Sequence, residues 1–204
     1  MDVVSLEIPE VKLIKPRVFP DARGFFMQTY HYEQYRDAGI TVRFVQDNWS
    51  RSAKGVLRGL HYQLKKPQAK LVSVIRGEVF DVAIDIRQGS PTFGKWAGTV
   101  LSEENRHQMF IPAGFAHGFC VLSDTVDLLY KCSDFYTPGD EYSIRWDDPD
   151  LAIEWPVTDV ILADKDLRAP RLKNVPAENL PGLSMQIVNT IDILHKTVRG
   201  SKPE

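Results

Sequence analysis

The chain has few cysteines, no excess of charge of either sign, and no basic stretch ahead of an apolar run at its start. Cys120 and Cys132 lie in apolar, strand-like runs without the C-x-x-C spacing of redox or zinc motifs, so we expect reduced core thiols. The 25 basic and 27 acidic side chains give a net charge of -2, which provides no general attraction to nucleic acid or anionic membranes. Residues 1–9 resemble neither a signal peptide nor a membrane anchor, so we expect a cytoplasmic protein.

The sequence also lacks a Pro-, Ser- or Gly-rich stretch long enough to link two domains. A chain of 204 residues can bury one sizeable core. We therefore predict a single domain over residues 1–204. Its expected parts are N-terminal strands in 1–50, a barrel core in about 51–146, and a C-terminal loop and helix region in 147–204.

Short runs rich in Val, Ile, Phe and Tyr, separated by Gly, Pro, Asn and Asp, extend from Lys12 to about Trp146. This pattern predicts an all-β fold, an antiparallel barrel or sandwich, with few helices. The expected strands are 43–50, 56–63, 70–76, 78–86, 94–101, 107–111, 115–122, 126–133 and 142–146. Residues 80–86 alternate between apolar side chains and a face that carries Asp81 and Asp85, which we expect to be solvated.

Two helices are expected outside these strands. Residues 32–38 predict two helical turns, closed by Gly39 in the left-handed conformation. A C-terminal helix is expected from Ser184, which can cap it. Its apolar stripe consists of Ile187, Ile191, Leu194 and Val198.

Residues 55–63 place Arg58 and His61 inside a segment patterned as a buried strand, and residues 111–119 place His117 on a second one. A guanidinium is costly to desolvate unless an anion meets it, and a histidine titrates near neutrality. The two segments therefore predict a cleft for proton transfer on an anionic substrate. Strict alternation sends Arg58 and His61 to opposite faces, but a bulge at Gly59 can turn both toward the cleft.

Lys70 and Tyr130 also lie on apolar strand faces. Burial of two histidines, a lysine, an arginine and a tyrosine without function would leave too many polar groups unpaired. Asp166, in the loop expected after the barrel, can supply the missing carboxylate. If Asp166 accepts a hydrogen bond from one ring nitrogen of His61, it fixes the tautomer and makes the other nitrogen a better base.

Residues 112–117 resemble the second metal motif of cupin barrels. The first cupin motif normally adds a His-x-His pair and a glutamate, whereas here Tyr62 and Gln63 follow His61 and Lys70 comes next. Two imidazoles beside an ammonium group make a poor site for a divalent cation. We expect no metal.

From about Pro16 to Pro170, the chain resembles the dTDP-4-dehydrorhamnose 3,5-epimerase family, cupin-type β-barrels (jelly rolls) that act on nucleotide-linked 4-keto-6-deoxy sugars. The matching segments, in order, are 19–26 (FPDARGFF), 46–48 (QDN), 58–63 (RGLHYQ), 68–72 (QAKLV), 90–94 (SPTFG), 114–119 (GFAHGF), 130–131 (YK), 155–156 (WP) and 165–166 (KD).

The resemblance implies a role for each site residue. His61 would be the general base, Asp166 its orienting partner, Tyr130 the acid on the other face of the sugar, and Lys70 the group that stabilises the enolate oxygen. The implied substrate-binding residues are Arg23, Gln28, Gln46, Asn48, Arg58, His117, Glu141 and Lys165. The resemblance further implies no cofactor, and a homodimer with crossed N-terminal strands in which Arg23 serves the neighbouring subunit's site.

The chain departs from the family pattern at three positions. Gln28 stands in place of the usual glutamate, Trp49 in place of a frequent histidine, and Phe135 in place of a frequent tyrosine near the nucleotide base. These changes leave open an epimerase acting at one carbon or on a related nucleotide sugar. A non-catalytic sugar-binding cupin is a further alternative, although simple binding needs no base and acid on opposed faces.

Overall fold

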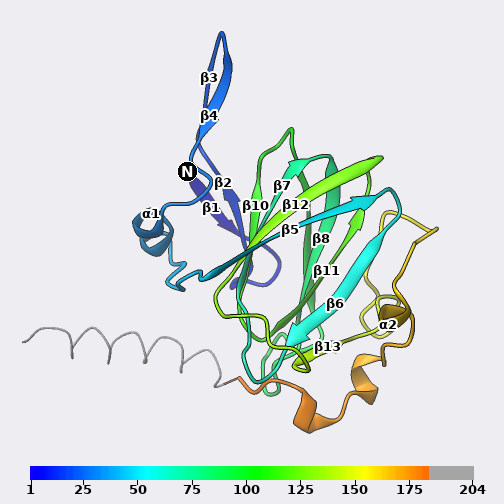
Figure 1. Cartoon of the computed structure of the whole chain (residues 1–204). Helices are drawn as coiled ribbons and strands as arrows, with labels where there is room; N and C mark the ends of the chain where they lie inside the picture. The colour runs from blue at the N-terminus through cyan, green and yellow to red at the C-terminus, as the bar shows by residue number, and fades with distance from the viewer. Residues whose placement is uncertain (184–204) are drawn as a thin grey trace, which may run out of the picture.

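A computed structural model of the chain describes residues 1–183, and the helix expected from Ser184 lies outside them. Two antiparallel sheets face each other, as expected for the jelly roll (Figure 1). The first sheet has six strands in the order β1-β2-β10-β7-β12-β5. Their bounds are β1 Asp2–Ser5, β2 Lys12–Lys15, β5 Gln46–Ala53, β7 Lys70–Arg76, β10 Gln108–Ile111 and β12 Thr125–Cys132.

The second sheet has five strands in the order β13-β6-β11-β8-β9. Their bounds are β6 Leu57–Gln63, β8 Glu78–Asp85, β9 Trp96–Ser102, β11 Phe115–Val121 and β13 Glu141–Ser143. The expected strands from 56 to 133 agree to within about two residues. The strand expected at 43–50 starts instead at Gln46 and extends to Ala53, and the one expected at 142–146 is shorter.

The main core lies between the two sheets. The inward faces of both sheets supply aliphatic and aromatic side chains that are almost fully buried, among them Val72, Ala83, Phe119 and Leu128. Cys120 and Cys132 are buried free thiols, as expected. Packing on this interior face fixes the strand register, because a slip of one residue would turn every core side chain outward.

The outer face of the five-stranded sheet is covered by the C-terminal part of the chain. Leu151 and Leu172 pack there against Val82 and Ile84 of β8. This cover contains the short helix α2 (Asp164–Leu167) and the 3-10 turns η1 (Leu172–Asn174) and η2 (Ala177–Asn179), drawn in yellow and orange in Figure 1. Both faces of β8 are therefore buried.

The expectation of a solvated face at Asp81 and Asp85 is wrong. Both carboxylates are 0% exposed, because they point between the sheets while Val82 and Ile84 pack under the C-terminal cover. Each has a partner: Asp81 contacts His117, and Asp85 accepts hydrogen bonds from Arg87. Alternation along β8 thus separates two buried surfaces instead of a core and a wet face.

The N-terminal part of the chain adds a helix and a hairpin. Helix α1 (Tyr32–Asp37) is followed by Gly39 with φ of +86°, the left-handed conformation expected of it. Tyr35 of α1 packs against Ile14 and Phe110 on one end of the six-stranded sheet. Strands β3 (Val18–Asp21) and β4 (Gly24–Met27) form a hairpin that projects away from the two sheets (Figure 1).

No helix within residues 1–183 is both long and apolar enough to cross a membrane.

Candidate active site

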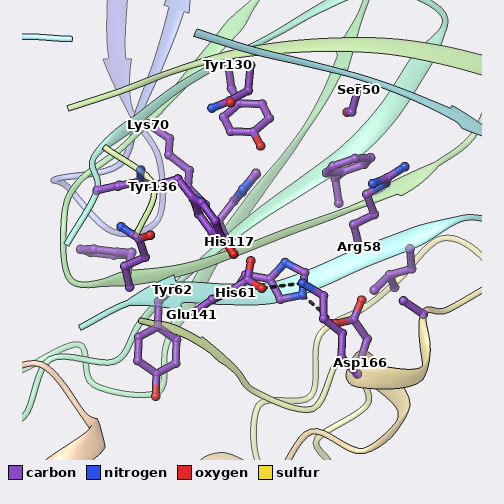
Figure 2. Close-up of a pocket in the computed structure, with 18 of the residues that line it drawn as sticks. Ser50, Arg58, His61, Tyr62, Lys70, His117, Tyr130, Tyr136, Glu141 and Asp166 are labelled. Carbon is purple, nitrogen blue, oxygen red and sulfur yellow. Dashed lines mark hydrogen bonds and ion pairs between the residues drawn. The ribbon is translucent and has the colours of Figure 1, made fainter. Parts of the chain in front are cut away.

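A cavity of about 600 Å³ opens between the two sheets and the segment that carries α2 (Figure 2). Ten of the twelve residues expected from the sequence line it: Gln46, Asn48, Arg58, His61, Lys70, His117, Tyr130, Glu141, Lys165 and Asp166. They come from both sheets and from α2. Residues far apart in the sequence therefore converge on one polar cleft.

Strand β6 carries both Arg58 and His61 into this cavity because its register shifts between them. His61 pairs with His117 of β11, but Arg58 pairs with Phe119, so one residue is bulged out. Gly59 has φ of +135°, and a Cβ atom there would lie 2.5 Å from the Cα of Gly118. Only glycine fits this close approach. The bulge expected at Gly59 is confirmed.

His61 and Asp166 form a close pair. His61 Nε2 lies 2.6 Å from Asp166 Oδ1. The Asp166 side chain is 2% exposed, and the His61 side chain, at 19%, reaches the cavity. Asp166 lies on helix α2 and not in a loop as expected, which fixes its backbone next to β6. The pairing leaves Nδ1 of His61 as the free ring nitrogen.

His61, Lys70 and Tyr130 each have a polar side-chain atom with no hydrogen-bond partner within residues 1–183. These atoms are His61 Nδ1, Lys70 Nζ and the Tyr130 hydroxyl. Because Arg106 Nε is the one unpartnered polar side-chain atom that is buried in this part of the chain, all three must be accessible to solvent. All three therefore open into the cavity that their residues line.

Lys70 and Tyr130 approach the cavity from the six-stranded sheet, opposite His61. Lys70 Nζ lies 6.0 Å from the centre of the Tyr130 ring. Burial lowers the pKa of the Lys70 ammonium and raises the pKa of the Tyr130 hydroxyl. Figure 2 shows the Tyr130 hydroxyl pointing into the cleft from the side facing His61 and Asp166. An acid and a base can thus act on opposite faces of one ligand.

His117 has its own carboxylate partner. Its Nε2 lies 2.9 and 3.1 Å from the two oxygens of Asp81, which is fully buried. Burial lowers the pKa of His117 and outweighs the attraction of Asp81. Asp81 was expected to be solvated and was therefore missed as a site residue, because the pairing of β8 with the strand that carries His117 is seen only in the structure.

Polar side chains around the cavity hold one another in place. Gln46 Nε2 donates to Asn48 Oδ1 at 3.0 Å, and Gln46 Oε1 accepts from the backbone of Tyr136 at 2.9 Å. Lys165 Nζ and Glu141 Oε2 form an ion pair at 2.6 Å. Arg58 Nε donates to Ser52 Oγ at 3.0 Å.

Two expected binding residues lie away from this cavity. Arg23 sits at the tip of the β3–β4 hairpin with its side chain 91% exposed, paired with Asp21. Gln28 is exposed and accepts a hydrogen bond from Gln34. Neither lines the cavity of its own chain.

Trp49 and Phe135 do not line the cavity either. Trp49 is 68% exposed on the outer face of β5, where its indole N–H donates to Asp127. Phe135 is also outside, and its neighbour Tyr136 lines the cavity instead. Further lining residues missed in the sequence are Ser50, Val56, Leu57, Tyr62, Gln63, Gln68, Gly114, Phe115, Phe119, Ile161, Leu162 and Ala163.

The chain is similar to proteins of known family over the whole region that forms this site. The family model described as dTDP-4-dehydrorhamnose 3,5-epimerase matches residues 5–174. The chain belongs to this family. The match includes every expected site residue, so the resemblance seen in the sequence motifs is confirmed.

Individual relatives carry the same description. The chain is 56% identical over 168 residues to the dTDP-4-dehydrorhamnose 3,5-epimerase of Pseudomonas aeruginosa, which covers 81% of this chain and 93% of the relative. It is 55% identical over 168 residues to that of Neisseria gonorrhoeae, covering 82% of this chain. The chain spans about half the length (51%) of the Neisseria protein.

A solved structure agrees in fold. The dTDP-6-deoxy-D-glucose-3,5-epimerase of Legionella pneumophila, crystallised with dTDP-4-keto-L-rhamnose, superposes with a TM-score of 0.87 at 55% identity. The superposition covers 89% of this chain and 97% of that one. The epimerase family and its cupin-type fold are thus established for this chain.

Proposed function

We propose that this protein inverts C3 and C5 of dTDP-4-keto-6-deoxy-D-glucose and yields dTDP-4-keto-L-rhamnose. The observation that carries the proposal is the His61–Asp166 pair facing Tyr130 across one cavity, with the Lys70 ammonium open to the same space. Family membership and the bound sugar nucleotide in the Legionella pneumophila relative support the choice of substrate.

The chemistry follows from a single ketone. The C4 carbonyl acidifies the protons on both C3 and C5, so one site can process the two carbons in turn. His61 Nδ1 takes the proton from carbon, while Asp166 holds the imidazole through Nε2 and stabilises the imidazolium that forms. Lys70 stabilises the negative charge that develops on the C4 oxygen.

Inversion requires that the new proton come from the other side. Tyr130 supplies its hydroxyl proton to the carbon face opposite His61, and the resulting tyrosinate and imidazolium then re-equilibrate with water. Burial raises the pKa of Tyr130, so the hydroxyl holds its proton until the enolate has formed. One turn of this cycle at each carbon gives the doubly inverted product.

The remaining polar side chains suit a nucleoside diphosphate. The Arg58 guanidinium can meet diphosphate oxygens with paired donors while Ser52 holds its Nε. Gln46, Asn48, Glu141 and Lys165 offer amide, carboxylate and ammonium groups around the same cavity.

We further propose that the protein is a homodimer in which Arg23 of one subunit completes the site of the other. The exposed hairpin tip carries Arg23 away from its own cavity, and Phe25 and Phe26 beside it are 56% and 65% exposed. Exposed aromatic side chains next to a cation favour contact with a second protein surface and its anionic ligand.

We propose that catalysis needs no metal or other cofactor, because the four residues above supply each proton transfer and the oxyanion contact. Residues 1–183 contain no group of three or more His, Cys, Asp or Glu side chains placed to hold a metal. We also propose a cytoplasmic location, with which the free, buried Cys120 and Cys132 are consistent.

Proton exchange in heavy water tests the reaction. With the 4-keto sugar nucleotide, deuterium should enter at both C3 and C5, and NMR can follow each position. The same incorporation is expected after exhaustive chelation. Label at one carbon only would make the protein a mono-epimerase, and no label with intact binding would make it a sugar-binding protein.

Mixed dimers test the role of Arg23. Arg23→Ala and His61→Ala proteins should each be weakly active or inactive alone. After co-refolding, half of the dimers combine the two variants, and each has one complete site, so activity should return to about a quarter of the wild-type value. No recovery, with mixed dimers confirmed by mass, would mean that Arg23 acts within its own chain.

A further inference from the structure

Strand β8 carries two buried carboxylates on one face, and they have different surroundings. Asp85 accepts hydrogen bonds from Arg87 Nε, Arg87 Nη2 and the backbone N–H of Arg87, and also from the hydroxyls of Ser90 and Thr92. All of these donors lie within seven residues of it. Its charge is therefore satisfied locally, away from the cavity.

Asp81, four residues earlier, is also 0% exposed. Within residues 1–183 its hydrogen-bonding partner is His117, whose Nε2 lies 2.9 and 3.1 Å from the two carboxylate oxygens. A buried carboxylate with a single imidazole as its hydrogen-bonding partner needs a proton on that nitrogen, because two unprotonated acceptors would repel each other. The Asp81 carboxylate therefore selects the tautomer with the proton on Nε2.

The other ring nitrogen of His117 faces the ligand space. Nδ1 makes no hydrogen bond within the described part of the chain. Arg106 Nε is the one unpartnered polar side-chain atom there that is buried, so Nδ1 is accessible to solvent. Since His117 lines the cavity, Nδ1 is open to it. Burial lowers the pKa of His117, so the ring is neutral near pH 7 and Nδ1 carries a lone pair.

We propose that Asp81 is a positioning residue that holds His117 with its proton on Nε2, so that Nδ1 serves as a hydrogen-bond acceptor for a hydroxyl of the sugar. The nature of this ligand rests on the proposed function. The acceptor is useful because the cationic groups nearby, Lys70 and Arg58, can only donate. A sugar hydroxyl that donates to Nδ1 fixes the ring orientation from which C3 and C5 present their protons.

Paired substitutions on β8 test the proposal. In Asp81→Asn the amide can accept from or donate to Nε2, so both tautomers of His117 become accessible. The variant should bind dTDP-L-rhamnose, which lacks the 4-keto group and is not turned over, about 2–10-fold more weakly, the loss of one neutral hydrogen bond. Its affinity for dTDP, which has no sugar, should stay unchanged in calorimetry.

Asp85→Asn is the matched control, since it removes an equally buried charge from the same face of the same strand. It should lower the melting temperature and leave the ratio of the two affinities at the wild-type value. An equal change of this ratio in both variants would overturn the proposal, because it would report general damage to the sheet. An unchanged ratio in Asp81→Asn would also overturn it.

The tautomer can be read directly in the wild-type protein. Nitrogen-15 shifts of His117 should show a protonated Nε2 and an unprotonated Nδ1 at pH 7. A proton on Nδ1 would overturn the assignment even if Asp81→Asn failed to fold. This measurement needs no turnover, so absence of epimerase activity would contradict the proposed function and leave the tautomer result standing.

Discussion

The two histidine–carboxylate pairs of the cavity have the same residue types and different settings. His61 of β6 and His117 of β11 are paired in register on neighbouring strands of the same sheet. The partner of His61 is Asp166, 105 residues away on α2, and the ring is 19% exposed. The partner of His117 is Asp81 on the adjacent strand β8, and there the two side chains are 8% and 0% exposed.

This difference in setting separates their proposed roles. A general base must gain and lose protons with water, which suits the more exposed His61. His117 is deeper, and burial lowers its pKa, so it stays neutral and suits hydrogen bonding. A histidine–carboxylate pair therefore does not define a base, because depth and access to solvent decide which chemistry the pair performs.

The strongest test of this comparison replaces each histidine in turn. His61→Ala should reduce both deuterium exchange and inversion by about 10⁴-fold, the upper range for a positioned base. His117→Ala should mainly raise KM, by about 10-fold for the loss of one hydrogen bond to the ligand, and keep exchange measurable. NMR of one labelled sample gives both rates. Near-normal exchange in His61→Ala, with exchange lost in His117→Ala, would reverse the two roles.

Asp166→Asn provides the control within the His61 pair. The amide keeps the size of the side chain but removes the charge that stabilises the imidazolium, so activity should fall by about 10²-fold, less than in His61→Ala. A larger loss than that of His61→Ala would indicate that Asp166 has a second task in the site.

Tyr130→Phe removes the proposed acid opposite His61. Proton removal should persist, because His61 and Lys70 are unchanged. The enolate should regain its proton from His61 on the original face, so deuterium enters with retention while inversion falls by about 10²–10⁴-fold. Equal losses of exchange and inversion would instead assign Tyr130 to packing or binding.

The smallest effect concerns the pH profile. Burial lowers the pKa of Lys70 below its ordinary value of 10.5, and only the charged form stabilises the enolate. As pH rises through this lowered pKa, kcat/KM should fall earlier than an ordinary lysine would dictate. Tyr130 cannot cause this early decline, since its pKa is raised.

Lys70→Arg and Lys70→Met give the matching controls. The arginine variant stays charged at high pH, so the alkaline decline of kcat/KM should move upward. In the wild type the unfolded chain binds the Lys70 proton more tightly than the folded chain does. The free energy of unfolding therefore falls as pH drops below the unfolded pKa of Lys70, and the loss is complete below the folded pKa. Lys70→Met should therefore melt at a higher temperature at pH 7. An unchanged alkaline limb in Lys70→Arg would remove Lys70 from the rate profile.

Local sequence patterns predicted much of the fold and the site. The strands from 56 to 133 follow from apolar runs broken by turn residues, and Gly59 marked the bulge that brings Arg58 and His61 together. Asp166 was expected as the carboxylate partner of His61, and the family motifs supported this pairing, which depends on a contact between distant segments. No local pattern contains that contact.

The errors arose where tertiary packing changed the meaning of a pattern. Asp81 and Asp85 looked solvated because alternation normally separates core from water, but the C-terminal cover buries the other face of β8. Arg23 and Gln28 are a different case: they lie away from the cavity of their own chain, and for Arg23 the family resemblance already implies a role in the neighbouring subunit's site.

The C-terminal cover also links catalytic competence to local unfolding. His61, Lys70 and Tyr130 are carried by strands, whereas Asp166 and Lys165 arrive on α2, which is attached to the barrel through the packing of segment 147–183. If this segment detached while the sheets stayed intact, the base would lose its carboxylate but the barrel would remain folded. Amide hydrogen exchange in 147–183 should therefore report the loss of an active enzyme before any probe of the β-sheets records unfolding.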